Sequence, residues 1–167
     1  MDTRLTFRSA TTYEPGTVYA ILVECYADLL DAALRDSFRQ FDQRVFADPQ
    51  TVGACAIVSS VGDETVGFVS HGPRQGPDTG LIGQNGVLPA FQRRGYGTQQ
   101  VLEIIRRFTA RGYARARVST SEHPFFAPAR RMYEKCGFRE TGRVPNDRWG
   151  PYAIVYYEKS LIEDSSS

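Results

Sequence analysis

Hydrophobic residues recur along the first part of the chain with two different periods. Leu5 and Phe7 alternate with polar neighbours within residues 4–10, which predicts a short strand that ends before Pro15 and Gly16. Beyond these breakers, apolar residues recur at spacings of three and four, which predicts a helix with one buried face. That face consists of Val18, Ile21, Leu22, Cys25 and Leu29. Another face of the same helix is expected to carry three acids: Glu24, Asp28 and Asp31.

A second, short helix and three strands are predicted next. The helix is stopped by Asp48 and Pro49, and its apolar residues keep the helical spacing: Leu34, Phe38, Phe41 and Val45. Three extended patterns follow at residues 54–61, 64–72 and 79–89. Turn-forming residues separate them, so the pattern predicts an antiparallel meander.

The period changes again after Gly97. A helical stripe is predicted to end near Gly112, and it consists of Val101, Ile104, Ile105 and Phe108. A buried strand, a helix and two last strands are expected at residues 115–120, 127–136, 138–144 and 152–161. One helix therefore lies between the fourth and fifth strands and is expected to form a crossover.

This order of elements predicts an α+β fold. We expect a mixed, mostly antiparallel central sheet of about seven strands flanked by helices. A chain of 167 residues suits one domain, expected over residues 4–162, with residues 163–167 as a disordered C-terminal tail.

Charge is balanced over the whole chain but not along it. The net charge is +1, which gives no general argument for binding to nucleic acid or to a membrane. Residues 92–117, however, contain one acid, Glu103, and seven arginines: Arg93, Arg94, Arg106, Arg107, Arg111, Arg115 and Arg117. This segment is expected to attract a polyanionic ligand. RNA is not expected there, because Tyr96, Phe108 and Tyr113 fall at helix-core or terminal positions and not on a strand platform.

The cysteines and histidines are few and scattered. The three cysteines, no apolar N-terminal segment and no run long enough to cross a bilayer predict a reduced, cytoplasmic location. His71, His123 and the cysteines also lack metal-ligand spacing, so no metal is expected.

The segment Gln92-Arg93-Arg94-Gly95-Tyr96-Gly97 stands where a helix is predicted to begin. The first N–H groups of a helix lack partners within the helix, and the helix dipole adds positive charge there, so the position favours anions. Glycines allow the backbone to approach a ligand closely. The spacing matches neither a nucleotide triphosphate loop nor a dinucleotide fingerprint, so another phosphate-bearing ligand is required.

With Val87-Leu88-Pro89 before it, this segment resembles the diphosphate-binding motif of the GNAT superfamily of acyl-CoA-dependent N-acetyltransferases. A second GNAT-like motif, Ala-x-x-x-Tyr-x-x-x-Gly-Phe, starts at Ala129 and ends at Phe138. The predicted order of elements also resembles the whole family fold, over about residues 4–162. The resemblance implies transfer of an acetyl group from acetyl-CoA to the primary amine of a small-molecule or peptide acceptor, without a metal, and homodimers are frequent in the family.

The resemblance also implies which residues hold acetyl-CoA. In the family, the pantetheine arm pairs with the backbone of the fourth strand, here near Val87 and Leu88, between splayed fourth and fifth strands. The diphosphate lies on the motif, and a strand N–H stabilises the tetrahedral intermediate. The implied residues that bind acetyl-CoA are Val87, Leu88, Gln92, Arg93, Arg94, Gly95, Tyr96, Gly97 and Thr98.

Tyr133 matches the family tyrosine near the CoA sulfur. An ordinary thiol has a pKa of about 8.5 and an ordinary tyrosine one of about 10, so proton transfer to the thiolate costs about 2 kcal/mol. We therefore expect Tyr133 to stabilise the leaving sulfur by a hydrogen bond, with proton transfer optional. The same residue also fits a purely structural place between helix and sheet.

The general base is not assigned by the sequence. Many family members carry a glutamate on the fourth strand, whereas residues 83–86 of this chain contain no ionisable side chain. His71 and Glu24 are candidate bases, and an ordered water held by Asn85 is an alternative. Phe126 stands where the family often has an asparagine.

The acceptor side is implied by the first two helices and the loop between the last two strands. These segments contain Glu24, Tyr26, Asp28, Asp31, Asp147 and Trp149. Acids and aromatic rings suit a cationic amine, although the helix acids equally fit a solvated face. Because the fourth-strand acid is missing, a non-catalytic acyl-CoA-binding regulatory module is the alternative function.

Overall fold

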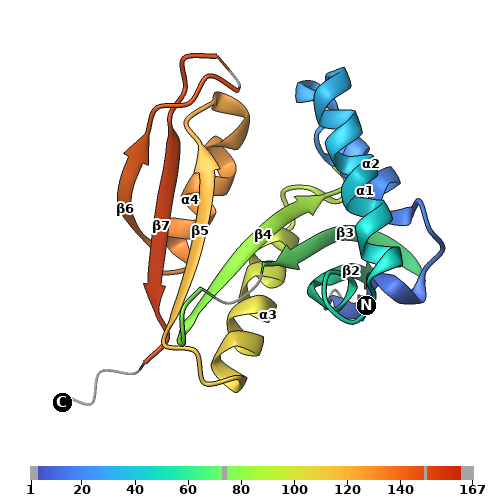
Figure 1. The fold of residues 1–167 in the computed structure, drawn as a ribbon, viewed down its shortest axis with the longest axis horizontal. Coiled ribbons are helices and arrows are strands. Elements are labelled where there is room, and N and C mark those ends of the chain that lie inside the picture. The colour runs from blue at the N-terminus through green and yellow to red at the C-terminus, as the bar shows by residue number, and fades with distance from the viewer. Residues whose placement is uncertain (1–3, 73–74, 149, 163–167) are drawn as a thin grey trace. The chain divides into compact units, whose positions relative to one another are not determined.

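The computed structural model describes residues 4–72, 75–148 and 150–162. These residues form four α-helices and a seven-stranded sheet of order β1-β2-β3-β4-β5-β7-β6 (Figure 1). The helices are α1 (Thr17–Cys25), α2 (Ala32–Ala47), α3 (Tyr96–Ala110) and α4 (Ala127–Lys135). The strands are β1 (Thr6–Ser9), β2 (Ala56–Val61), β3 (Glu64–His71), β4 (Thr79–Val87), β5 (Arg115–Ser121), β6 (Arg139–Val144) and β7 (Ile154–Ser160). Trp149 and the predicted tail at 163–167 lie outside the described residues.

The strand directions confirm the predicted α+β fold. β1 pairs with β2, β2 with β3, β5 with β7 and β6 with β7, all antiparallel. β4 and β5 are parallel, and their register covers only Thr79–Leu81 against Arg115–Arg117. Parallel neighbours require a crossover connection, and α3 supplies it, as the sequence predicted.

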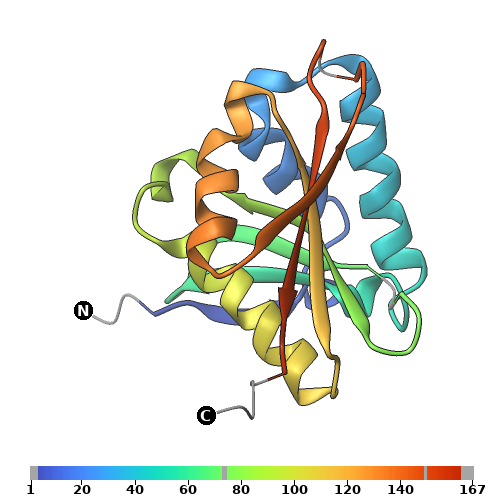
Figure 2. The ribbon, with the colours of Figure 1, turned by 90° about the vertical axis from the view of Figure 1, so that its left-hand side faces the viewer.

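The chain divides into two compact units. Unit 1 contains Met1–His71 and Gln84–Gln100, and unit 2 contains Gly72–Gly83 and Val101–Ser167. In unit 1, α1 and α2 lie side by side (Figures 1 and 2). The fully buried side chains of unit 1 include Val18, Leu22, Val45, Ile57, Val58 and Phe68. In unit 2, α4 lies along the β5–β7–β6 part of the sheet (Figure 2), and the buried side chains include Phe108, Val118, Tyr133, Val155 and Tyr157.

Asp42 on α2 provides the N-terminal cap of α1. Gly16 precedes α1 with a φ of 98° and has no side chain to cap the helix. The buried Asp42 instead accepts hydrogen bonds from the N–H groups of Gly16 and Tyr19, both at 3.0 Å. Since exposed helix N–H groups need acceptors, this carboxylate fixes α1 against α2.

Three predictions about the elements were wrong in detail. The first helix ends at Cys25, so Asp28 lies in the following 3₁₀ turn η2 (Ala27–Leu29) and the expected acidic face does not form on α1. Asp31 accepts from the N–H of Leu34 at 2.7 Å and caps α2, which at 16 residues is not short. β5 is not buried throughout, because its residues alternate between buried and exposed.

No helix in the described part of the chain is both long and apolar enough to cross a membrane.

Candidate active site

The segment between β4 and α3 presents an exposed turn at the start of a long helix. After the 3₁₀ turn η4 (Pro89–Phe91), residues 92–95 are exposed. Arg93 and Gly95 have positive φ angles of 64° and 80°, which turn the backbone into α3. The first bond of α3 runs from the N–H of Gln99 to the carbonyl oxygen of Gly95, at 3.1 Å.

The N–H groups of Tyr96, Gly97 and Thr98 precede that first bond. A helix leaves its first amides without internal acceptors, and among the described residues no other acceptor bonds these three. The positive end of the helix dipole lies at the same place. The turn therefore has the backbone arrangement that favours an anion such as a phosphate, and phosphate binding by this motif stays a prediction.

The side chain of Tyr96 anchors the turn to the core of unit 1. It is buried and packs with Leu5 and Val66, and its ring centroid lies 6.5 Å from that of Phe91. Tyr96 can therefore offer a ligand its backbone N–H, whereas its side chain holds the helix start in place.

Ion pairs divide the seven arginines of residues 92–117 into two groups. Four have a carboxylate partner: Arg106 and Arg107 pair with Glu103, Arg115 with Asp78, and Arg117 with Glu158. Among the described residues, no carboxylate pairs with Arg93, Arg94 or Arg111. Arg94 instead stacks over the Phe91 ring, with 5.7 Å from its guanidinium carbon to the centroid. The uncompensated positive charge at the helix start therefore comes from the two arginines of the motif.

The end of β4 lies next to this turn. The N–H of Leu88 donates to the carbonyl oxygen of Val66 (2.8 Å), and the Leu88 carbonyl accepts from the N–H of Phe91 (2.9 Å). Adjacent amides of a strand point to opposite edges, so the Val87 N–H points away from β3. Gln92 Nε2 donates to the Val87 carbonyl at 3.1 Å, which ties the turn to the strand. Of the two predicted pantetheine partners, Val87 is the one whose N–H faces away from the paired strand.

The polar side chains of β4 point to two different sides. Gln84 Oε1 accepts from the hydroxyl of Tyr26 at 3.0 Å, and the Gln84 N–H donates to Ser70 Oγ at 2.9 Å. Asn85 Oδ1 instead accepts from Gln100 Nε2 of α3 at 2.6 Å. The amide of Asn85 is thus engaged with α3, and Gln84 is the polar side chain on the α1 side of the strand.

The candidate bases differ in exposure. His71 is buried at the end of β3, with 6% of its surface exposed, whereas Glu24 is exposed on α1. Next to Glu24, burial and, to a smaller extent, the Glu24 charge together raise the pKa of the Cys25 thiol to about 12. Cys25 is therefore a neutral thiol near neutral pH, and its Sγ would lie 3.0 Å from a Cβ added at Gly86. We assign it a packing role.

Tyr133 lies in an aromatic cluster of unit 2. Its ring centroid is 5.7 Å from that of Phe138 and 6.0 Å from that of Tyr157, and the residue is 4% exposed. Burial raises the pKa of Tyr157, with smaller contributions from Glu134 and Glu140. The tyrosine of the second motif is therefore buried and packs against two aromatic rings.

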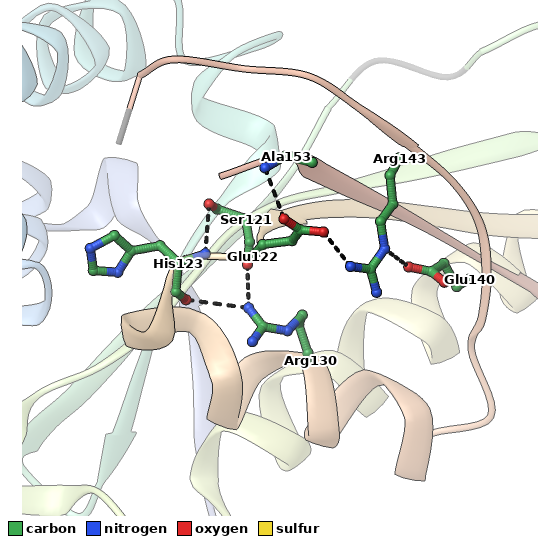
Figure 3. A network of polar contacts seen from close by, with 7 residues as sticks. All are labelled: Ser121, Glu122, His123, Arg130, Glu140, Arg143 and Ala153. Carbon is green, nitrogen blue, oxygen red and sulfur yellow. Dashed lines mark hydrogen bonds and ion pairs between the residues drawn. The ribbon is translucent and has the colours of Figure 1, made fainter. Parts of the chain in front are cut away.

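A polar network joins the end of β5 to the β6–β7 connection of unit 2 (Figure 3). One Glu122 oxygen accepts from Arg143, and the other accepts from the Ala153 N–H at 3.2 Å. The Glu122 N–H donates in turn to the Ala153 carbonyl at 2.9 Å. His123 packs on Tyr152 with 4.9 Å between ring centroids. Glu122 therefore holds the β6–β7 loop to the end of β5. Asp147 is exposed in this loop, and Trp149 lies outside the described residues.

Arg130 on α4 extends the same network. Its guanidinium donates to the carbonyl oxygens of Ser121 and His123, where β5 passes into the 3₁₀ turn η5 (Pro124–Phe126). In the described part of the chain, no group of three or more His, Cys, Asp or Glu side chains could hold a metal ion.

Comparison with known proteins identifies the family. The model of the acetyltransferase (GNAT) family matches residues 17–138, which is more than half of the 167 residues. The chain therefore belongs to the GNAT acetyltransferase family, as its two motifs indicated. No curated protein matches the chain.

Solved structures of low sequence identity share the fold. A protein described as an acetyltransferase of the GNAT family from Desulfovibrio desulfuricans is 16% identical, with a TM-score of 0.79 over 95% of this chain and 100% of that one. An aminoglycoside 6′-N-acetyltransferase in complex with coenzyme A is 16% identical, with a TM-score of 0.71 over 98% and 100%. The ribosomal-protein-S18-alanine N-acetyltransferase of Escherichia coli is 16% identical, with a TM-score of 0.69 over 98% of each chain.

Proposed function

We propose that this GNAT protein transfers the acetyl group of acetyl-CoA to a primary amine of a small-molecule or peptide acceptor. The observation that carries the proposal is the exposed turn at the start of α3. This turn has three backbone N–H groups without a helix acceptor and two residues with positive φ angles. It also carries two arginines without a carboxylate partner among the described residues. This combination suits a diphosphate, which is the most highly charged internal group of coenzyme A.

The proposed binding residues divide by the part of the donor that they would hold. The amides from Arg93 to Thr98 and the side chains of Arg93 and Arg94 would hold the diphosphate. Gln92 and the backbone of Val87 and Leu88 would accompany the pantetheine arm. Acetyl-CoA then supplies an activated acyl group, because its thioester has a good leaving group.

In the proposed reaction, the neutral amine nitrogen attacks the acetyl carbonyl carbon and forms a tetrahedral oxyanion. The carbon–sulfur bond then breaks, its electron pair stays on sulfur, and the amine proton passes to a base or to water. Backbone N–H donors that stabilise such an oxyanion contribute about 3–4 kcal/mol. Tyr133 would donate a hydrogen bond to the leaving sulfur. The products are an acetylated amine and CoA.

The acceptor is proposed only as an amine. The solved structures with a similar fold include an aminoglycoside acetyltransferase and a ribosomal-protein acetyltransferase, which themselves act on very different amines. At 16% identity, these likenesses carry the fold and not the acceptor. Cys25, Cys55 and Cys136 form no disulfide among the described residues, which fits the further proposal that the protein works in the reducing cytoplasm.

A non-catalytic acyl-CoA-binding module is the second candidate function. It is favoured by the absence of an ionisable side chain at residues 83–86 and by the engagement of Asn85 with Gln100. Such a module would bind acetyl-CoA and release no CoA when amines are added.

Thiol release from acetyl-CoA across a panel of amines tests the proposal, with Tyr133→Phe as the diagnostic variant. Tyr157→Phe is the matched control, because Tyr157 is a buried tyrosine of the same aromatic cluster. We expect turnover with at least one amine, kcat about tenfold lower in Tyr133→Phe, and no change in Tyr157→Phe. Binding of CoA without turnover of any amine in the panel would favour the binding module. Turnover that is equal in the parent, Tyr133→Phe and Tyr157→Phe would contradict the proposed role of Tyr133.

A further inference from the structure

Gln100 is a fully buried polar residue in the apolar stripe of α3. It is 0% exposed, and it follows Tyr96 by four residues and precedes Ile104 by four on the same helix face. Ser59 Oγ donates to its Oε1 at 2.6 Å. Its Nε2 contacts three acceptors: Asn85 Oδ1 at 2.6 Å, the Gly86 carbonyl at 3.2 Å and the Phe68 carbonyl at 3.3 Å.

The backbone around Gln100 is adapted to this side chain. A Cβ added at Gly67 would lie 2.6 Å from Gln100 Oε1 and 2.3 Å from the Gly86 carbonyl oxygen. Contacts that short do not occur, so β3 must carry glycine at this position, both because the backbone of β4 comes so close and because Gln100 Oε1 occupies the space beside it. A leucine would fill a helix-to-sheet core without any such arrangement, and burial of an amide is unfavourable unless its hydrogen bonds are made.

The network of Gln100 joins the end of β4, which precedes the proposed CoA-binding turn, to α3, which follows it. Asn85 and Gly86 directly precede Val87 on β4, and Asn85 Nδ2 also approaches the Gly97 carbonyl at 3.5 Å. Together with the Gln92 contact to Val87, these bonds fix the end of β4 against the first turn of α3. A fully satisfied buried network allows one geometry, whereas apolar contacts tolerate several.

We propose that Ser59, Asn85 and Gln100 form a positioning network for coenzyme A. The network sets the distance between the amides that hold the diphosphate and the strand that accompanies pantetheine. This inference rests on the proposed CoA site and adds three residues that bear on donor affinity. It requires only contacts within unit 1.

The test replaces the whole network by apolar side chains of similar shape. In the triple variant Ser59→Ala, Asn85→Leu and Gln100→Met, no polar side chain of the network is left without a partner, so folding is retained better than in a single variant. Gln99→Met is the matched control. It places the same substitution on the neighbouring residue, whose Oε1 accepts from the N–H of Leu5, just before β1, at 3.2 Å and not from β4.

Calorimetry then compares two ligands: CoA, which spans the turn and the strand, and 3′-phosphoadenosine 5′-diphosphate, which lacks pantetheine. We expect the triple variant to bind CoA about tenfold more weakly and the fragment within about twofold of the parent. Gln99→Met should bind both ligands as the parent does. Faster amide exchange in peptides covering 84–88 and 95–98 of the ligand-free triple variant is expected as well.

The possible results distinguish failure of the positioning role from failure of the proposed CoA site. Unchanged CoA affinity in the triple variant overturns the positioning role and leaves the proposed CoA site intact. Equal weakening of CoA and the fragment also overturns it, because it assigns the network to folding or to the turn alone. If the parent protein binds no CoA, the proposed function fails, and this inference fails with it.

Discussion

Arg93 and Gly95 adopt backbone conformations with positive φ at the proposed diphosphate site. For a residue with a Cβ, such a conformation costs about 1–2 kcal/mol, so Arg93 is strained and Gly95 is not. An added Cβ at Gly95 would meet no atom within 4 Å. The requirement for glycine there is thus conformational, and steric exclusion by neighbouring protein atoms plays no part.

Gly95→Ala should therefore lower both stability and CoA affinity. We expect a loss of about 1 kcal/mol in the free energy of unfolding, because alanine disfavours φ near 80°. Gly95→Asn should lose less, because asparagine tolerates this conformation. Gly112→Ala is the control: Gly112 has a φ of 77° and open space around it at the other end of α3. It should lose similar stability and keep CoA affinity. Denaturant unfolding and calorimetry measure both, and equal affinity in Gly95→Ala would contradict the assignment.

Replacement of the two motif arginines tests local charge. Arg93→Gln with Arg94→Gln should weaken CoA binding about tenfold or more, because charge-assisted hydrogen bonds to phosphate are lost. Arg106→Gln with Arg115→Gln removes the same total charge from arginines that already have carboxylate partners. That control should change affinity by no more than about twofold. Similar losses in both pairs would mean that general electrostatic attraction, and not this turn, determines binding.

The residues of the turn could be predicted from the sequence because helix starts and glycines have local physical signatures. Which arginines form ion pairs could not be predicted, because the pairing of Arg115 with Asp78 and of Arg117 with Glu158 depends on strand register. Gln100 left one signal in the sequence, a polar residue at a buried helical spacing. Its partners on β2 and β4 follow only from tertiary packing.

Among the elements, the connection between β6 and β7 depends on one carboxylate. A hydrogen bond from the Ala153 N–H, and then Arg143, hold the pKa of Glu122 below its usual range. A lowered pKa means that the folded loop favours the ionised carboxylate. The tether is therefore complete at neutral pH and is lost only as the pH falls through this lowered pKa, below the usual range of a glutamate.

Glu122→Gln should remove this acid dependence. In the parent, the amide resonance of Ala153 is expected to shift as the pH falls below the usual range of a glutamate pKa, because protonation of Glu122 weakens its hydrogen bond. In Glu122→Gln, the shift should be absent and the Ala153 amide should exchange faster at neutral pH. Glu140→Gln is the control, because Glu140 also pairs with Arg143 and has no bond to Ala153. An unchanged titration in Glu122→Gln would assign the shift to another group.

The order and type of the elements could be predicted because apolar periodicity is a local property. The end of α1 could not, because Leu29 continues the apolar spacing past Cys25 while Asp31 begins the next helix as its cap. β5 was predicted to be buried from its small and apolar residues, but Arg115, Arg117 and Ser119 point to an exposed face. Strand pairing decides which face is covered, and one strand alone does not encode it.

At the scale of the whole molecule, two elements belong to both compact units. β4 contributes Thr79–Gly83 to unit 2 and residues 84–87 to unit 1, and the boundary in α3 falls between Gln100 and Val101. Helix and strand formation are cooperative along a continuous backbone. If residues 4–162 are a single domain, as predicted, the two units should therefore unfold together.

Val118→Ala in the core of unit 2 tests this prediction. The side chain is 3% exposed, and its truncation should cost about 2 kcal/mol. If unfolding is one transition, slowly exchanging amides of unit 1, such as those around Val58 and Phe68, must lose the same protection as those around Val155 of unit 2. Hydrogen exchange measured by mass spectrometry compares the two sets directly. Ser119→Ala is the control, because Ser119 is exposed on the same strand and should change neither set. Loss of protection confined to unit 2 would mean that β4 and α3 break at the unit boundary and that the chain folds as two domains.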